Sequence, residues 1–337
     1  MFFVNFDPIC KELKILLKGK HPFISAELQY FLELFSSCND LAYTDVIYIY
    51  SDNWKVWWKE YLRHYRIEHG DNIHRFIQAF EEKCVSVGFP EADQCANFEA
   101  CSIREKYGIP KGKKVLVLFP FPWRLPFSIW THVIYKPQPY LFKLFRLILN
   151  GAFTYLPDLK RGIHDLKLSE IIRQFAVKND AYFVVKGRLK NKIPGYLKRL
   201  ADKVFLDESF YPFTTLELLY IADLSISFYS AAIMESVLAR TPTLCLSPKR
   251  DMFWPGYDDR HFMPAFSPSP GSFYHSYGAV YYETVDNFIS SFHGKTFEDF
   301  EPDKNKMGEF ITKFFGFKDW NACDRIYEDL IRRTQSI

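Results

Sequence analysis

The chain has 337 residues, of which 48% are apolar and 25% are charged, and its formal net charge is +3. This composition is that of a globular protein and excludes a disordered chain, and the length allows two compact domains with cores of their own. The seven cysteines occur without CxxC pairs, which favours reduced thiols over a disulfide framework or a zinc site.

Positive charge is concentrated in one part of the sequence. Residues 111–205 hold 19 lysines and arginines against 5 acids, whereas the rest of the chain holds 24 against 35. Such a segment indicates an anionic partner, either a nucleotide diphosphate or an acidic membrane surface. Aromatic residues make up 18% of the chain, and 34 of them are phenylalanine. A biased codon usage together with a phenylalanine-rich core is the structural explanation of this excess.

The first 90 residues predict a short α/β region. Strand-like residues 44–50 (TDVIYIY) follow a helical pattern at 27–34, and helical patterns at 55–66 and 74–84 come next. We expect residues 1–90 to be a remnant of an N-terminal lobe with its linker.

Helices and apolar strands then alternate over residues 113–290, which predicts a doubly wound parallel sheet. We assign residues 91–310 to this second domain and residues 311–337 to a closing helix. The strands are nearly continuous apolar runs, as expected where both faces of a parallel sheet are covered. The expected strands are 113–119, 181–186, 203–206, 224–228, 243–246 and 280–282, and the expected helices are 102–107, 166–176, 193–201, 216–222, 284–292 and 320–332, with a further helix carrying Glu235.

The most informative unit is residues 216–246. A helix, a strand, a turn of small residues around Ser230, a second helix and a second strand follow one another there. Ligands of doubly wound sheets bind beyond the carboxyl ends of the strands, and helix N-termini there attract phosphate. The turn at Ser230 is therefore the expected phosphate site.

This unit resembles the donor half of the GT-B glycosyltransferases, and most nearly the group of CDP-glycerol glycerophosphotransferases and bacterial surface-polysaccharide transferases. Three further segments agree in order and spacing. Residues 85–93 (VSVGFPEAD) resemble the linker between the lobes, residues 107–124 resemble the entry strand with its "PTwR" end, and residues 317–326 resemble the closing "DGxAxxRI" helix.

The resemblance implies a GT-B-like α/β fold, with a donor-binding Rossmann-like domain and a reduced or truncated N-terminal Rossmann-like lobe. A full acceptor lobe of this family has nearly twice the length of residues 1–90, and we interpret the shortness as truncation rather than as a naturally reduced lobe. It also implies a transferase that moves a sugar or polyol phosphate from a nucleotide-sugar or CDP-polyol donor to a glycan or lipid-linked acceptor. Such enzymes need no metal or other cofactor, and this chain has no DxD pair framed by apolar strands.

Five residues are candidates for holding the donor phosphates. Ser230 with the backbone of Ala231 would supply hydroxyl and N–H donors, while Lys186, Arg188 and Arg124 would supply positive charge. Lys186 and Arg188 stand where the glycerophosphotransferase pattern has a His-Pro pair, a departure that leaves the donor open. For each cation the alternative is an ordinary surface residue.

The other candidates serve the nucleoside and the acceptor. Glu235, one helical turn beyond Ser230, would accept from the ribose hydroxyls, or else would pair with Arg240. Tyr211 or Phe213 would stack on the nucleobase, while Thr214 or Thr215 would cap the helix that follows. The acceptor hydroxyl needs a base from the first lobe, for which His21 and Asp52 are the candidates.

Residues 120–157 form an aromatic and basic insertion between a strand and a helix. Its amphipathic part, 140–153, either lies in a membrane interface or packs on the protein. No apolar run could span a bilayer and no signal peptide is visible, so we expect a cytoplasmic protein, which docks peripherally on the inner face of the membrane if this amphipathic part binds lipid.

The sequence leaves two rival functions open. The first is a nucleotide-sugar epimerase or hydrolase of the same fold. The second is a nucleotide-binding, membrane-docking module without turnover. We do not expect a nucleic-acid partner, because the basic segment coincides with the nucleotide cleft.

Overall fold

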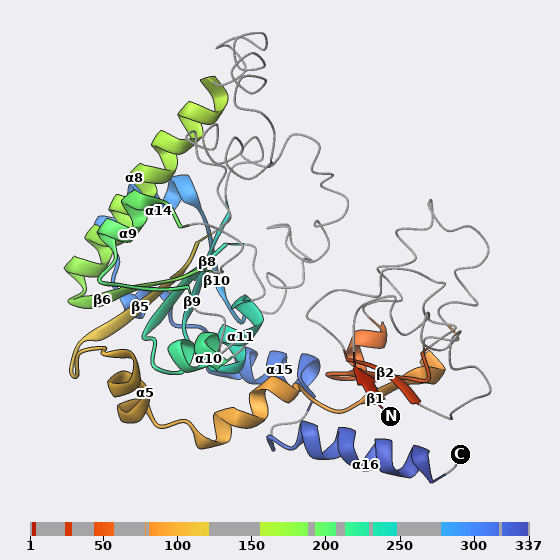
Figure 1. Ribbon diagram of the computed structural model, residues 1–337. Helices are drawn as coiled ribbons and strands as arrows, with labels where there is room; N and C mark the ends of the chain where they lie inside the picture. Colours follow the sequence, from red (N-terminus) through yellow and green to blue (C-terminus); the bar gives the residue numbers. More distant parts are fainter. Residues whose placement is uncertain are drawn as a thin grey trace, which may run out of the picture. The chain divides into compact units, whose positions relative to one another are not determined.

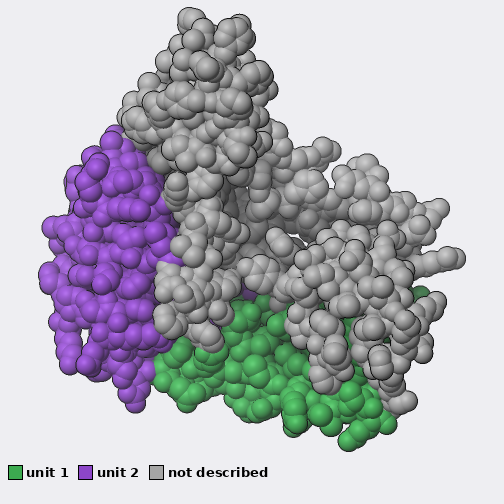
Figure 2. Space-filling view, viewed as in Figure 1, with its two compact units in different colours: residues 1–98, 260–279, 303–337 green, residues 99–259, 280–302 purple. Residues whose placement is uncertain are grey.

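The computed structural model forms two compact units, coloured separately in Figure 2. Unit 1 comprises residues 1–98, 260–279 and 303–337, and unit 2 comprises residues 99–259 and 280–302. The residues that the structure describes are 2–4, 24–28, 44–56, 78, 81–120, 156–187, 193–206, 213–228, 232–247, 278–316 and 319–335.

Unit 2 is built on a six-stranded sheet in which every pair of neighbouring strands is parallel. The spatial order is β7-β6-β5-β8-β9-β10, the order of a Rossmann-type sheet. The sequence predicted this doubly wound α/β architecture, and the prediction is confirmed. The strands are β5 (Lys114–Phe119), β6 (Ala181–Lys186), β7 (Lys203–Phe205), β8 (Leu224–Ser227), β9 (Thr243–Ser247) and β10 (Tyr281–Thr284).

Helices cover both faces of this sheet, α8, α9 and α14 on one face and α5, α10 and α11 on the other (Figure 1). The pleat assigns alternate residues to the two faces, so that Leu116 and Leu118 of β5 belong to the core beneath α8 while Val117 points the other way. The helices are α5 (Ala100–Tyr107), α8 (Leu156–Lys178), α9 (Gly195–Leu200), α10 (Phe213–Tyr220), α11 (Ala232–Leu238) and α14 (Val285–Ser291).

Phenylalanine rings fill the core on the α8 side. Phe175 of α8 contacts Phe288, Phe297 and Phe300, with ring centroids 5.4–5.9 Å apart, and all four side chains are buried. Burying one such ring stabilises a fold by about 1.5–3 kcal/mol. These four phenylalanine residues therefore serve the core.

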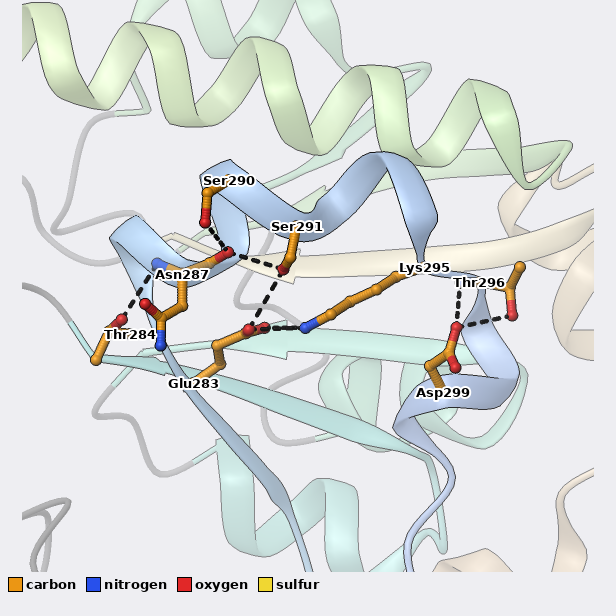
Figure 3. Close-up of polar contacts among 8 residues, drawn as sticks. All are labelled: Glu283, Thr284, Asn287, Ser290, Ser291, Lys295, Thr296 and Asp299. Atoms are coloured by element: carbon orange, nitrogen blue, oxygen red, sulfur yellow. Dashed lines mark hydrogen bonds and ion pairs between the residues drawn. The ribbon is translucent and has the colours of Figure 1, made fainter.

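A polar network ties edge strand β10 to the segment that follows α14 (Figure 3). Lys295 Nζ lies 2.7 Å from both carboxylate oxygens of Glu283 and also over the rings of Tyr281 and Phe300. Ser291 Oγ lies 3.5 Å from the same carboxylate. The ion pair is mostly shielded from water, with side-chain exposures of 19% and 11%. These contacts hold the edge of the sheet and have no counterpart among the expected site residues.

Unit 1 contains a four-stranded parallel sheet in the order β1-β2-β3-β4. Its strands are β1 (Phe2–Val4), β2 (Ile24–Leu28), β3 (Val46–Ile49) and β4 (Cys84–Ser86), and its helices are η1 (Pro90–Asn97), α15 (Lys304–Phe314) and α16 (Ala322–Thr334). The expected helix at 27–34 is wrong at its start, because Glu27 and Leu28 pair with β3 in a strand. Cys84, the expected end of another helix, likewise begins β4.

Side chains from the N-terminal segments cap both C-terminal helices of unit 1. Ser51, Asn53 and Trp54 donate hydrogen bonds of 2.6–2.9 Å to the last carbonyls of α15. Asp93 accepts from the first two N–H groups of α16, at 3.0 and 2.7 Å. Such groups have no partner within their own helix, so these caps fix both helices in unit 1.

A buried polar pair adds a further tie between α16 and the sheet. Tyr48 of β3 donates a hydrogen bond of 3.0 Å to Asp329, which also accepts from Arg333 at 2.6 Å. The C-terminal segment therefore belongs to the same unit as the first strands.

Candidate functional site

The strand order of unit 2 creates a topological switch point between β5 and β8. From β5 the chain runs outward to β6 and β7, and it then returns to the other side of β5 to form β8, β9 and β10. In doubly wound sheets, ligands bind at such a switch point, beyond the carboxyl ends of the two strands between which the direction changes. At this end Phe119 of β5 is paired with Ser227 of β8.

Three residues form a row across this end of the sheet. Leu118 is paired with Val185 on one side and Ile226 on the other, so the next residues, Lys186, Phe119 and Ser227, lie level with one another. Val185, Leu118 and Ile226 face the core beneath α8. The three residues of the row therefore share the opposite face, on which α10 and α11 lie. With about 4.8 Å between strands, the row spans about 10 Å.

Lys186 is the cation of this row. Its side chain is 5% exposed, and its ammonium donates a hydrogen bond of 2.8 Å to the carbonyl of Gly187. Burial of an ammonium is costly unless hydrogen bonds and negative charge compensate it. A lysine held here can supply positive charge to an anion beyond the strand ends.

The backbone next to Lys186 is tightly fixed. Gly187 N donates to the carbonyl of Phe205 at 2.9 Å. A Cβ atom on Gly187 would lie 2.6 Å from Cδ1 of Ile193 and 3.1 Å from Cδ2 of Leu206, so only glycine fits without a shift. This packing holds the end of β6, and with it Lys186, in one position.

Serine hydroxyls line the same face of β8. Ser225 Oγ lies 2.9 Å from Thr243 Oγ1 and 3.2 Å from Ser236 Oγ, and all three residues are buried. Ser227, two residues further toward the carboxyl end, is also fully buried, but its Oγ has no hydrogen-bond partner among the described residues. An unsatisfied buried polar group costs about 1–3 kcal/mol.

The first turns of α10 and α11 lie on this face as well. Glu235 falls in the first turn of α11, where its partly buried carboxylate interacts favourably with the helix dipole. Thr214 is 2% exposed, and its Oγ1 has no hydrogen-bond partner within the described part of the chain. The sequence favoured Thr214 or Thr215 as the cap of this helix, but α10 already begins at Phe213, so both residues lie inside it.

Asp52 is the one expected catalytic residue that the structure describes. It follows β3 in unit 1, and its carboxylate lies 2.7 Å from the ammonium of Lys55. The hydrogen bond from Lys55 holds the pKa of Asp52 below its ordinary value. A carboxylate with a lowered pKa is a weaker proton acceptor, and this argues against Asp52 as the general base. Its catalytic role stays a prediction.

The remaining expected residues fall outside the described residues. This holds for one catalytic candidate and five donor-binding candidates, which are His21, Arg124, Arg188, Tyr211, Ser230 and Ala231. Most of the insertion 120–157, with its amphipathic part 140–153, lies outside them too. The chain flanking Ser230 is described, however: β8 ends at Ser227, and α11 begins at Ala232.

The sequence missed two members of the row. Ser227 and Phe119 were interpreted only as strand residues, because their alignment depends on the order of the strands in the sheet.

Within the described residues, no three His, Cys, Asp or Glu side chains are grouped so as to hold a metal ion. In the same part of the chain, no helix has the length and apolarity needed to cross a membrane.

Two α/β units, one of them with a Rossmann-type sheet, are the elements of a GT-B-like fold. No protein-family model and no curated protein matches the sequence. Solved structures of the wall teichoic acid polymerase TagF match the fold. One, of a TagF variant soaked with CDPG, has 13% identity and a TM-score of 0.52 over 96% of this chain and 71% of its own. Another TagF structure has 12% identity and a TM-score of 0.51 over 95% and 71%. The expected resemblance to the GT-B group is confirmed for the fold.

Proposed function

We propose that this chain is a transferase that moves a sugar or polyol phosphate from a nucleotide-activated donor to a surface-polysaccharide or lipid-linked acceptor. The observation that carries the proposal is the row at the switch point of unit 2. It combines a buried lysine and a hydroxyl at the position where doubly wound sheets bind nucleotides. The fold shared with TagF, one structure of which was soaked with CDPG, supports a CDP-linked donor as the first candidate.

In this proposal Lys186 balances the negative charge that develops on the leaving phosphate. Charge stabilisation by fixed groups is the largest contribution in many enzymes, and it is strongest where water is excluded. Lys186 suits this role because its ammonium is shielded from water and the backbone beside it is held by the packing around Gly187. Ser230 and Ala231, which follow β8 closely in the chain, would bind the same phosphates through hydroxyl and N–H groups.

The other roles follow from position on the same face. Glu235 would accept hydrogen bonds from the ribose hydroxyls, since a carboxylate can bind two neighbouring hydroxyls at once. Arg124 and Arg188 would add charge, and Tyr211 would stack on the base. His21 or Asp52 would take the proton of the acceptor hydroxyl. We propose that no metal takes part.

A thermal-shift panel with CMP, CDP, UDP and GDP, each with and without EDTA, tests the proposal. We expect at least one nucleoside diphosphate to raise the melting temperature, with CDP first among them and with no effect of EDTA. An unchanged melting temperature with all four nucleotides would contradict a nucleotide-dependent transferase. A shift that EDTA abolishes would refute the metal-independent mechanism.

A further inference from the structure

The hydroxyl of Ser227 has an unusual environment for a residue inside a sheet. Ser225 and Ser227 lie on the same face of β8, and both are fully buried. The Oγ of Ser225 is hydrogen-bonded to the hydroxyls of Ser236 and Thr243, whereas the Oγ of Ser227 has no hydrogen-bond partner among the described residues. An alanine would fill this position without an unsatisfied group, so a purely structural role does not account for the serine.

The position of Ser227 in the fold explains why a serine is kept there. It is the last residue of β8, it is paired with Phe119 at the switch point, and it lies level with Lys186 on the same face. An anion held by the Lys186 ammonium would therefore lie beyond the strand end that carries the Ser227 hydroxyl. A hydroxyl can donate to a phosphate oxygen, and a hydrogen bond to a charged group is stronger than a neutral one.

We propose that Ser227 is a ligand-binding residue whose hydroxyl donates a hydrogen bond to the diphosphate of the nucleotide donor. This inference rests on the proposed function, since it needs a nucleotide at the switch point. Because Ser227 is fully buried in the structure, binding has to uncover its hydroxyl through a local rearrangement at the end of β8. The unsatisfied hydroxyl is then kept at a cost to the stability of the free protein, as occurs at binding sites.

Two serine-to-alanine variants test this proposal, because it predicts opposite effects for them on stability and on nucleotide affinity. In Ser227→Ala, the melting temperature of the free protein should stay the same or rise, while the affinity for the nucleoside diphosphate that binds the wild type falls about tenfold. In the matched control Ser225→Ala, two hydrogen bonds are lost, so the melting temperature should fall while the affinity stays within twofold of the wild type.

Calorimetric titration and thermal melting of both full-length variants give the readouts. Equal affinity of Ser227→Ala and the wild type would overturn the inference and leave the proposed function intact. A lowered melting temperature of free Ser227→Ala would also overturn it, since the hydroxyl would then have a structural partner. Absence of nucleotide binding to the wild type would instead refute the proposed function, and this inference with it.

Discussion

The close packing around Gly187 provides a quantitative test of how the end of β6 is held. In Gly187→Ala, the new Cβ would lie 2.6 and 2.8 Å from Cδ1 and Cγ1 of Ile193, well inside normal contact distance. Overpacking of this kind costs about 1–3 kcal/mol of unfolding free energy. Ile193 is 5% exposed, so Ile193→Ala should cost about 2–5 kcal/mol through the cavity that it leaves.

The double variant is the decisive one, because Ile193→Ala removes the two closest atoms that the new Cβ would meet and leaves only Leu206 Cδ2, at 3.1 Å. We expect the double variant to be more stable than the sum of the two single effects by about 1 kcal/mol or more. Urea denaturation of the four proteins measures this coupling. As a control, Gly294→Ala, where a Cβ would meet no atom within 4 Å, should combine additively with Ile193→Ala. Additivity within about 0.5 kcal/mol for the Gly187 pair would refute the packing argument.

Three further predictions concern unit 1 and are checked by urea denaturation. Asp93→Ala removes the cap of α16 and should cost about 0.5–2 kcal/mol, whereas an unchanged midpoint would mean that the cap contributes nothing. Tyr48→Phe should cost about 1.5–3 kcal/mol by removing a buried hydrogen bond to the charged Asp329, and a neutral result would contradict that contact. Burial raises the pKa of Glu91, so the folded protein binds this proton more tightly than the unfolded chain, and stability falls as the pH rises above about 4.3. Glu91→Gln should therefore stabilise the protein at pH 7 and lose this advantage toward pH 4; an equal midpoint at pH 7 would disprove it.

The fold of unit 2 could be predicted because its strands are apolar runs with clear boundaries. The predicted strand 181–186 coincides with β6, which follows a turn and ends just before Gly187. Unit 1 was harder. Helical spacing of apolar residues suggested a helix at 27–34, but the pairing of Glu27 and Leu28 with β3 overrides that local pattern at its start. Helix α15 was not predicted, although the sequence shows Asp303 as a cap and apolar residues at helical spacing, Met307, Phe310, Ile311 and Phe314.

The candidate site could be predicted only in part, because its geometry depends on strand order. Lys186 was recognisable as a cation at the end of a strand, and Glu235 as an acid at the start of a helix. The level alignment of Lys186 with Ser227 required the register of β6, β5 and β8, which lie apart in the sequence. The absence of a described partner for the Ser227 hydroxyl follows from the folded packing alone.

Calorimetric titration of the wild type and of Lys186→Ala with CDP, UDP and GDP tests the central claim most directly. Lys198→Ala, which removes an exposed cation from α9, is the matched control. We predict that the wild type and Lys198→Ala bind at least one of these nucleotides equally well, and that Lys186→Ala, still folded by circular dichroism, binds it at least tenfold more weakly. Equal binding by Lys186→Ala, or no binding by the wild type, would contradict a phosphate site at the carboxyl ends of β5, β6 and β8.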